Sequence, residues 1–528
     1  MTAAGMEFVI AFLSDHRCNE NPMLHVITPH VTDIEVTVTT PVWESVEALD
    51  MKFKINSSDA LEVSLPISLC VGSASVENKT IYITSTKPVF VFASFIQRKS
   101  GEYFVLYPVI SLGTFYIASG YTSDPSNLDD SSFIGCISLS ANTEVSVHVP
   151  VDQHFYFDNV SYSGDSVIKV FLSEYQVARI IATDVSGSFI ESNKPIAVFS
   201  GNVFVMIPGP VRTNGEQTSG FDLIMAQLPP ISSMSTIYPV VATHFNDEEW
   251  IRIFALDDQT TFYIYNASSY QMHVIGNKGS FYEVVVPKSS AATIISTKPV
   301  NVVQYSASSD NYGDARMIIT LSLDNYVSEY MFVIPDGPQM DTFTSFINVI
   351  ATESSLDRIY LDDINIMNLN TTHMPVSCGY RDLVSVWFAV DQGKHDLKCF
   401  LTNNEYCTVY IHGVDENNQY GTEANRFISS SQSFKSSMFE KKEVLEQGSI
   451  LTTIHYIVAE NKRPSFPPHV TFRARSSLEC HVICRQYENC ALIAFDKTNL
   501  TCDLYLLFAA TSSLEDKAGT KIFMIGTY

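Results

Sequence analysis

A seven-residue phrase occurs three times in this chain and constrains its fold more than any other feature. The phrase is a serine, a threonine or asparagine, then Lys-Pro, a β-branched residue and two more residues, the last of them valine. It occupies 85–91, 192–198 and 296–302, and its lysines are 107 and 104 residues apart. This spacing is longer than a solenoid repeat or a propeller blade. It suits a small β-domain used several times.

Each phrase predicts a corner between two strands. An isoleucine two residues before each serine ends one strand, and the short polar residues favour a turn by bonding their own backbone. Proline lacks a backbone donor and is tolerated at the first residue of a strand. The apolar residues that follow are typical of a buried strand. The alternative, a lysine repeated to bind an acidic partner, is disfavoured because it needs three copies of one ligand.

Composition supports several β-rich domains and excludes some functions. The chain has 528 residues, which indicates several domains, and its 33 Phe and 26 Tyr favour strands. A net charge of −25 argues against a nucleic-acid partner, because phosphate binding needs a basic surface. No apolar run is long enough for a transmembrane helix, so no membrane insertion is expected. No signal peptide is recognisable at the N-terminus, which predicts a truncated or mispredicted start if the chain is secreted.

The cysteines favour an oxidising compartment. Cys399 and Cys407 flank an Asn-Asn turn and predict a hairpin disulfide. The last four cysteines are spaced C-x3-C-x5-C-x11-C, a poor zinc pattern and a good disulfide pattern: Cys480, Cys484, Cys490 and Cys502. Four others have no assignable partner: Cys18, Cys70, Cys136 and Cys378.

Six N-glycosylation sequons point the same way. They begin at Asn56, Asn78, Asn159, Asn266, Asn370 and Asn499. Most stand beside turn-like sequence, where an acceptor asparagine is accessible. Together with the cysteine cluster they predict a secreted or extracellular protein.

The strand pattern predicts an all-β fold built from tandem β-sandwich-like units of about 105 residues. Clean alternation, as in Thr143–His148, is typical of a sheet with one wet face. The expected units are 1–125, 126–247, 248–340 and 341–422. The fourth unit is divergent and lacks the Lys-Pro phrase.

Residues 1–422 resemble the N-terminal domain of IgG-Fc-binding proteins. The most specific stretch is 184–201, which contains the second phrase, followed by Gln227-Leu228-Pro229-Pro230. The start at 5–12 and the closing Gln419-Tyr420-Gly421 also match. The resemblance implies an extracellular, non-enzymatic, all-β module found in mucus-type and cell-surface proteins. It supplies no Fc-binding residues, so none are assigned.

The C-terminal part changes character. Residues 423–471 form a linker with a Pro-rich insert, and 472–528 resemble a PAN/Apple domain with a helix carrying Cys480 and Cys484. The resemblance implies the pairs Cys480–Cys502 and Cys484–Cys490, which would pin the helix to a small α+β fold. The sequence alone allows three pairings. The Pro/Arg-rich insert at 462–475 departs from the family pattern.

Motifs for catalysis, cofactors or metals are missing from the sequence. No nucleophile elbow, zinc-helix, P-loop or dinucleotide fingerprint occurs. Four acidic pairs occur, and they are interpreted as solvated turns, with a calcium site or a catalytic pair as less favoured readings: Asp129-Asp130, Glu248-Glu249, Asp257-Asp258 and Asp362-Asp363. We therefore assign no catalytic, cofactor-binding or metal-binding residue. The tryptophans Trp43, Trp250 and Trp387 fit core anchors or sugar-stacking platforms.

The sequence thus predicts a non-catalytic recognition or adhesion module. Its expected partner is an extracellular glycoprotein or glycan at a mucosal or cell surface. Two alternatives stay open: a structural component of mucus or matrix without a discrete ligand, and a carbohydrate-active enzyme on a β-sandwich scaffold. The enzyme would need two carboxylates facing each other across a cleft.

Overall fold

The computed structural model divides the chain into two compact units. The first comprises Met1–Cys378 with Asp382–Ile428, and the second Gly379–Arg381 with Ser429–Tyr528. The structure describes residues 3–14, 20–97, 100–122, 131–208, 222–243, 247–266, 269–307, 315–335, 343–377, 382–399, 407–414, 419–426, 453–464, 470–473, 490–496, 501–506 and 514–527. Throughout these ranges the regular structure consists of antiparallel strands and short 3-10 helices. The all-β fold predicted from the sequence is confirmed.

The first sheet has seven strands in the order β4-β3-β7-β2-β5, with β1 and β8 also paired to β7. Strand β3 alternates buried valines with outward polar residues, as expected for a sheet with one wet face. The strands are β1 (Gly5–Ile10), β2 (Met23–Ile27), β3 (Ile34–Thr39), β4 (Asp50–Ile55), β5 (Ala60–Ser64), β7 (Ile81–Gln97) and β8 (Ser100–Val105).

The second sheet has ten strands in the order β13-β12-β15-β10-β16-β11-β14, with β6, β9 and β17 beside this path. Its β6 comes from the first segment of the chain and pairs with β15. The strands are β6 (Val76–Glu77), β9 (Gly113–Ile117), β10 (Ser132–Ser138), β11 (Thr143–His148), β12 (His154–Phe157), β13 (Val160–Ser163), β14 (Val167–Leu172), β15 (Val177–Ala182), β16 (Phe189–Val205) and β17 (Asp222–Gln227).

The third sheet has seven strands in the order β21-β20-β23-β19-β22, with β18 and β24 paired to β23. This sheet repeats the plan of the first, because its longest strand, β23, is again central and pairs with four others. The strands are β18 (Ser235–Val241), β19 (Glu248–Ala255), β20 (Thr260–Tyr265), β21 (Tyr270–Ile275), β22 (Phe281–Pro287), β23 (Ala291–Ser306) and β24 (Arg316–Ile319).

The rest of the first unit forms two five-stranded sheets. One has the order β28-β27-β31-β25-β34 and the other β29-β30-β26-β32-β33. Their strands are β25 (Glu329–Ile334), β26 (Thr344–Thr352), β27 (Ile359–Leu361), β28 (Ile364–Asn365), β29 (Thr372–Ser377), β30 (Asp382–Val390), β31 (Gly393–Cys399), β32 (Thr408–Val414), β33 (Gln419–Glu423) and β34 (Asn425–Arg426).

The 3-10 helices described in the first unit are η1 (Ile67–Leu69), η2 (Val109–Ser111), η4 (Ile231–Ser233), η5 (Leu323–Asn325), η6 (Glu353–Arg358) and η7 (Ile366–Asn368).

The Lys-Pro phrase lies inside one long strand in each of its three copies. The strands β7, β16 and β23 run for 17, 17 and 16 residues through the phrase. The expectation that one strand ends there and another begins is therefore wrong. The phrase instead forms a bulge, in which the long strand advances by five residues while the strand paired with it advances by two. The five-residue steps run from Thr84 to Val89 in β7, from Glu191 to Ile196 in β16 and from Ile295 to Val300 in β23.

Side chains of the phrase close the bulge the same way each time. The serine hydroxyl donates to the lysine carbonyl at 2.7, 2.6 and 2.6 Å. The lysine amines donate to Thr32 Oγ1, Ala141 O and Asp258 O, on the segment that enters the neighbouring strand. Because the chain bends here, β7 can pair with β1 and β3 before the phrase and with β2 and β8 after it. The phrase is a structural corner made by a bulge.

Strand pairing groups the segments differently from the expected unit boundaries. The strand β9 pairs with β16 of the second sheet, although the expected first unit extended to residue 125. The strand β18 likewise pairs with β23, and β25 pairs with β31. Each sheet therefore begins before the boundary that the sequence suggested. The division of 1–422 into four units remains a proposal.

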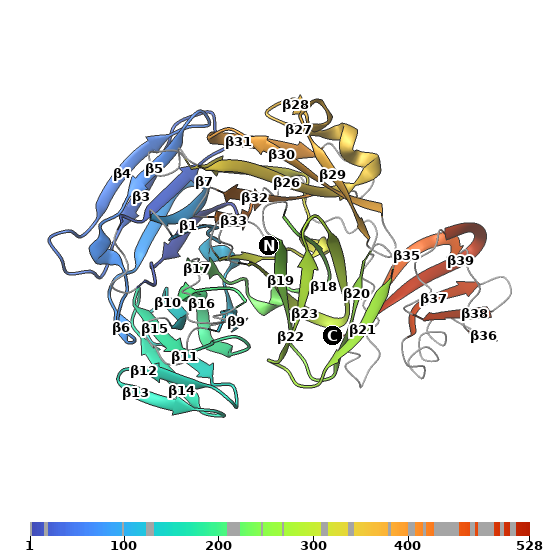
Figure 1. The fold of residues 1–528 in the computed structure, drawn as a ribbon, viewed down its shortest axis with the longest axis horizontal. Coiled ribbons are helices and arrows are strands. Elements are labelled where there is room, and N and C mark those ends of the chain that lie inside the picture. The colour runs from blue at the N-terminus through green and yellow to red at the C-terminus, as the bar shows by residue number, and fades with distance from the viewer. Residues whose placement is uncertain are drawn as a thin grey trace, which may run out of the picture. The chain divides into compact units, whose positions relative to one another are not determined.

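Four strands meet around a common centre in the first unit. The strand β8 contacts β17, β17 contacts β24, β24 contacts β33, and β33 contacts β8, which closes a cycle. Figure 1 shows β17 of the second sheet and β33 of the sheet that contains β32 near the middle of this unit. The strands β8 and β33 are joined by a hydrogen bond from Val105 N to Thr422 Oγ1 at 3.2 Å. Segments more than 300 residues apart thus become neighbours.

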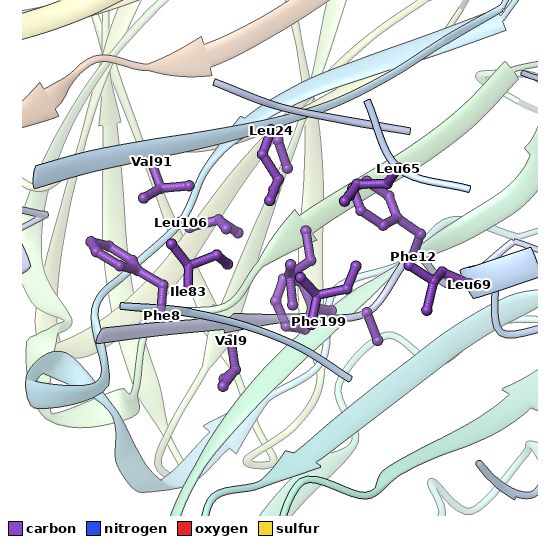
Figure 2. Packing of buried hydrophobic residues seen from close by; sticks show 14 of the residues in the cluster. Phe8, Val9, Phe12, Leu24, Leu65, Leu69, Ile83, Val91, Leu106 and Phe199 are labelled. Carbon is purple, nitrogen blue, oxygen red and sulfur yellow. The ribbon is translucent and has the colours of Figure 1, made fainter. Parts of the chain in front are cut away.

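The first and second sheets share one hydrophobic core. Phe8, Phe12 and Ile83 of the first segment pack with Phe199 of β16 in a single buried cluster (Figure 2). The approach is so close at Gly135 that an added Cβ would lie 2.1 Å from Leu13 Cδ1. The first and second sheets therefore pack directly against each other.

The second unit contains a five-stranded sheet in the order β35-β39-β37-β38-β36. Its strands are β35 (Thr453–Pro464), β36 (Val470–Arg473), β37 (Cys490–Asp496), β38 (Thr501–Leu506) and β39 (Leu514–Thr527). The helix predicted to carry Cys480 and Cys484 lies outside the described residues. Strand β35 runs within the expected linker, 423–471, so part of that segment is paired in a sheet.

Candidate functional site

The structure contains the hairpin disulfide expected between Cys399 and Cys407, whose Cα atoms are 6.7 Å apart. Cys70 is also disulfide-bonded. Cys136 is a buried free thiol, and burial raises its pKa to about 12. Such a thiol is a poor nucleophile at neutral pH. Cys18, Cys378, Cys480 and Cys484 lie outside the described residues, and Cys490 and Cys502 are placed by their backbone only.

Five of the six sequon asparagines lie in the described part of the chain, and all five are at turns or strand ends. Asn78, Asn159, Asn266 and Asn370 are exposed and Asn56 is half-buried. Asn499 falls outside the described ranges. Exposed turns are where a glycan can be accommodated.

A pocket of about 380 Å³ opens between the first and second sheets. One wall is the segment after β3, and the other is the turn between β14 and β15. Its lining residues are Pro41, Val42, Trp43, Glu44, Asn78, Ser173, Glu174 and Gln176. The pocket thus combines one indole ring with amides, carboxylates and a hydroxyl, the groups that bind sugars. Trp43 is half-buried and packs against the shared core. Trp387 is 2% exposed and Trp250 packs against the second core, so both are core residues.

The pocket contains two carboxylates, one from each of its walls. Both Glu44 and Glu174 are exposed to solvent. A glycosidase needs one carboxyl that is kept protonated by burial or by a close like charge. Of the other acidic pairs, Glu249 is buried in an ion pair, while Asp258 caps the Lys278 backbone N–H at 2.8 Å. Within the described ranges, no three His, Cys, Asp or Glu side chains are grouped to hold a metal ion.

Two buried arginines were not singled out from the sequence. Arg252 donates to Asp184 at 3.2 Å and to Glu283 at 2.8 Å, and its guanidinium lies 4.0 Å from the Tyr121 ring centre. Burial lowers the pKa of Arg252, but the charge of Asp184 and the other partners outweigh it and hold the pKa above its ordinary value. The guanidinium therefore stays charged and ties the second sheet to the third.

Arg316 joins the third sheet to the five-stranded sheet that contains β32. Its Nη2 lies 3.0 Å from Glu249 Oε1, and its Nη1 lies 2.9 Å from His412 Nδ1. Both members of the ion pair are fully buried. Burial lowers the pKa of Arg316, and burial raises the pKa of nearby Glu102, which accepts from Met317 N at 3.1 Å. These buried charges hold the central strands together, so they are structural.

An apolar edge strand is the second notable surface. In β21, three alternate residues are about half exposed: Tyr270 at 52%, Met272 at 57% and Val274 at 54%. The Tyr270 ring contacts the Tyr265 ring at 5.5 Å between centres. The other strands at the ends of the main strand order in the first three sheets are β4, β5, β14 and β22, which carry lysine or glutamate, and β13, which has only four residues. Charged or short edges normally prevent pairing with another chain, and β21 has neither protection.

These features define an all-β protein with a described pocket and an apolar edge strand that are suited to binding. The model of the IgGFc binding protein family matches residues 102–413, and the chain belongs to this family. The match lies within the expected 1–422 and does not reach the segment that resembles a PAN/Apple domain. No curated protein matches the chain.

Solved structures resemble the chain only remotely. A mutant of the arabinofuranosyltransferase AftD from Mycobacteria is 8% identical over 99% of this chain and 39% of its own, with a TM-score of 0.12. The same enzyme without that mutation is 9% identical over 100% and 38%, with a TM-score of 0.13. Trypsin-activated alpha-2-macroglobulin from Escherichia coli is 7% identical over 99% and 46%, with a TM-score of 0.13. The chain spans less than half the length of each, and scores this low carry no structural argument.

The described helices include none that is long and apolar enough to cross a membrane. The family and the disulfide are consistent with an extracellular protein.

Proposed function

We propose that this chain is an extracellular, non-catalytic recognition module that binds a glycoprotein at a mucosal or cell surface. Membership of a binding-domain family supports the class of function. The disulfide between Cys399 and Cys407 and the exposed sequons support the compartment. The observation that carries the proposal is the unprotected edge of β21.

The edge of β21 suits the addition of a strand from a partner. The strand Tyr270–Ile275 carries no Lys, Arg, Asp or Glu and no proline, the residues that oppose the addition of a strand. The exposed Tyr270, Met272 and Val274 side chains lie on one face, where they can cover alternate side chains of the incoming segment.

The partner that fits is an extended, uncharged or basic segment of another protein. The whole chain carries a net charge of −25, so a second copy would be repelled at low ionic strength. A segment without acidic residues meets no such opposition. A glycoprotein whose peptide segment pairs with β21 therefore satisfies both the apolar face and the charge.

The test measures saturable binding of the secreted full-length chain to immobilised IgG Fc and to a purified secreted mucin, alongside a glycan array. Met272→Lys places a charge on the β21 edge and is expected to weaken binding at least tenfold. Phe171→Lys is the matched control, because Phe171 is 69% exposed on the edge strand β14, which already carries a lysine. Equal binding by Met272→Lys and wild type would exclude β21. No saturable binding to any probe would contradict recognition and favour the structural-component alternative.

We also propose that 472–528 is a PAN/Apple-like domain with the pairs Cys480–Cys502 and Cys484–Cys490. The register of the second unit supports part of this, because Cys502 is opposite Phe495, five residues from Cys490 in β37. At about 3.4 Å per residue the two Cα atoms are roughly 17 Å apart, too far for a disulfide. This leaves two of the three pairings, including the proposed one. Peptide mapping without reduction would distinguish them.

A further inference from the structure

The pocket beside Trp43 contains a glycosylation sequon in its own wall. We infer that the N-linked glycan on Asn78 folds back into this pocket, with its first N-acetylglucosamine against the Trp43 ring. The pocket would then be filled by the chain's own sugar and would act as a joint between the first and second sheets. The inference does not depend on the partner proposed for β21.

Asn78 stands between the first and second sheets. It follows β6, which pairs with β15 of the second sheet, and it precedes β7 of the first sheet. Its side chain lines the pocket together with Trp43 and Gln176. A sugar joined to this side chain therefore starts at the pocket wall. A volume of about 380 Å³ is within the range of small-ligand pockets.

The hydrogen bonding of Asn78 leaves its side-chain nitrogen available for a glycan. Gln176 Nε2 donates to Asn78 Oδ1 at 3.0 Å, which uses the oxygen of the carboxamide and leaves the nitrogen for the glycan. Glycosylation joins that nitrogen to the anomeric carbon of the sugar. The nitrogen loses one proton, and a lipid pyrophosphate leaves the donor oligosaccharide. The bond to Gln176 can persist after the modification and hold the linkage in place.

The walls offer what an amino sugar needs. The half-buried Trp43 is held by the core beneath it, so its indole presents an ordered apolar platform for the C–H face of the ring. Ser173, Glu174 and Glu44 come from both sheets and can bond sugar hydroxyls. Neither Asn159 nor Asn370 lines this pocket. The arrangement is therefore specific to the Asn78 sequon.

Thr80 supplies a clean way to remove the glycan. It is the third residue of the sequon, it is fully buried, and its hydroxyl has no hydrogen-bond partner. Replacing a buried, unpartnered hydroxyl with a methyl of the same shape is close to neutral for stability. Thr80→Val thus abolishes glycosylation while Asn78 and its bond to Gln176 remain.

The experiment uses the full chain secreted from a eukaryotic host. Mass spectrometry measures glycan occupancy at Asn78 and Asn370, and then the rate at which an endoglycosidase removes each glycan from the native protein. We expect high glycan occupancy at both sites. Because the pocket shields the Asn78 glycan, we expect its removal to be about tenfold slower than removal at Asn370, which corresponds to about 1.4 kcal/mol of protection. After denaturation the two rates should become equal.

Two variants test the cause of the protection. Trp43→Leu should speed removal at Asn78 and leave Asn370 unchanged. Thr80→Val should raise the native-state amide hydrogen exchange of 42–44 and 173–176, whereas Asn370→Gln should not. An unoccupied Asn78, or equal native removal rates at the two sites in the wild-type chain, would overturn the inference without any variant. Neither outcome bears on binding through β21.

Discussion

The buried ion pair between Arg316 and Glu249 gives the sharpest test of how the first unit is held together. Neither side chain is exposed, and the pair links β24 to β19, 67 residues away in sequence. Arg316→Met removes the cation and leaves a buried carboxylate. Losing one partner of a buried pair costs about 3–5 kcal/mol.

The structure places the expected cost at the lower end of that range. Glu249 keeps two hydrogen bonds after the substitution, from Thr243 at 2.8 Å and Ser306 at 2.8 Å. We therefore expect Arg316→Met to lower the free energy of unfolding by about 3 kcal/mol. Adding Glu249→Gln removes the buried charge; the amide oxygen can accept from one of these hydroxyls, and the amide N–H can donate to the other. The double variant should be more stable than Arg316→Met alone.

Denaturant unfolding followed by tryptophan fluorescence measures both variants. Trp43, Trp250 and Trp387 all lie in the first unit, and the Trp387 ring is 4.8 Å from the ring of His412, which contacts Arg316. A cost below about 1 kcal/mol for Arg316→Met would refute the reasoning, because solvent would then be compensating the carboxylate. Additive losses in the double variant would also refute it, since they would show that the two charges do not depend on each other.

Three further predictions concern local features. Burial lowers the pKa of His395, but its bond to Asp362 at 2.6 Å outweighs this and holds the pKa above its ordinary value of 6.5. The pair's stabilisation is therefore complete below that value and is lost as pH rises through the raised pKa; Asp362→Asn should lower the His395 pKa measured by NMR and flatten this slope. Lys194→Ala removes one exposed bond across a bulge and should cost only about 0.5–1.5 kcal/mol in denaturant unfolding, whereas a ligand lysine would change binding instead. Removing the Cys399–Cys407 disulfide with serines should cost about 2–3 kcal/mol, the loop-closure entropy of a short loop, and an unchanged unfolding midpoint would contradict this.

Local patterns predicted much of the fold. Alternating and β-branched stretches indicated strands, and Ser-x-Lys-Pro indicated a corner, because turn chemistry and proline act over a few residues. The spacing of Cys399 and Cys407 around a turn likewise predicted the disulfide present in the structure. The sequence could not show that each long strand continues through its corner, because a bulge and a strand break begin with the same residues.

Contacts between distant residues were decided only in three dimensions. The pocket joins Trp43 to Gln176, and the central ion pair joins Glu249 to Arg316, although nothing near either residue in the sequence indicates its partner. The sheet to which β9 belongs was also set by packing, since an apolar strand can pair on either side. The sequence by itself therefore determined the repeating all-β character and the corners. Tertiary structure alone decided how the sheets share cores, where charges are buried, and that a pocket and an apolar edge strand are exposed.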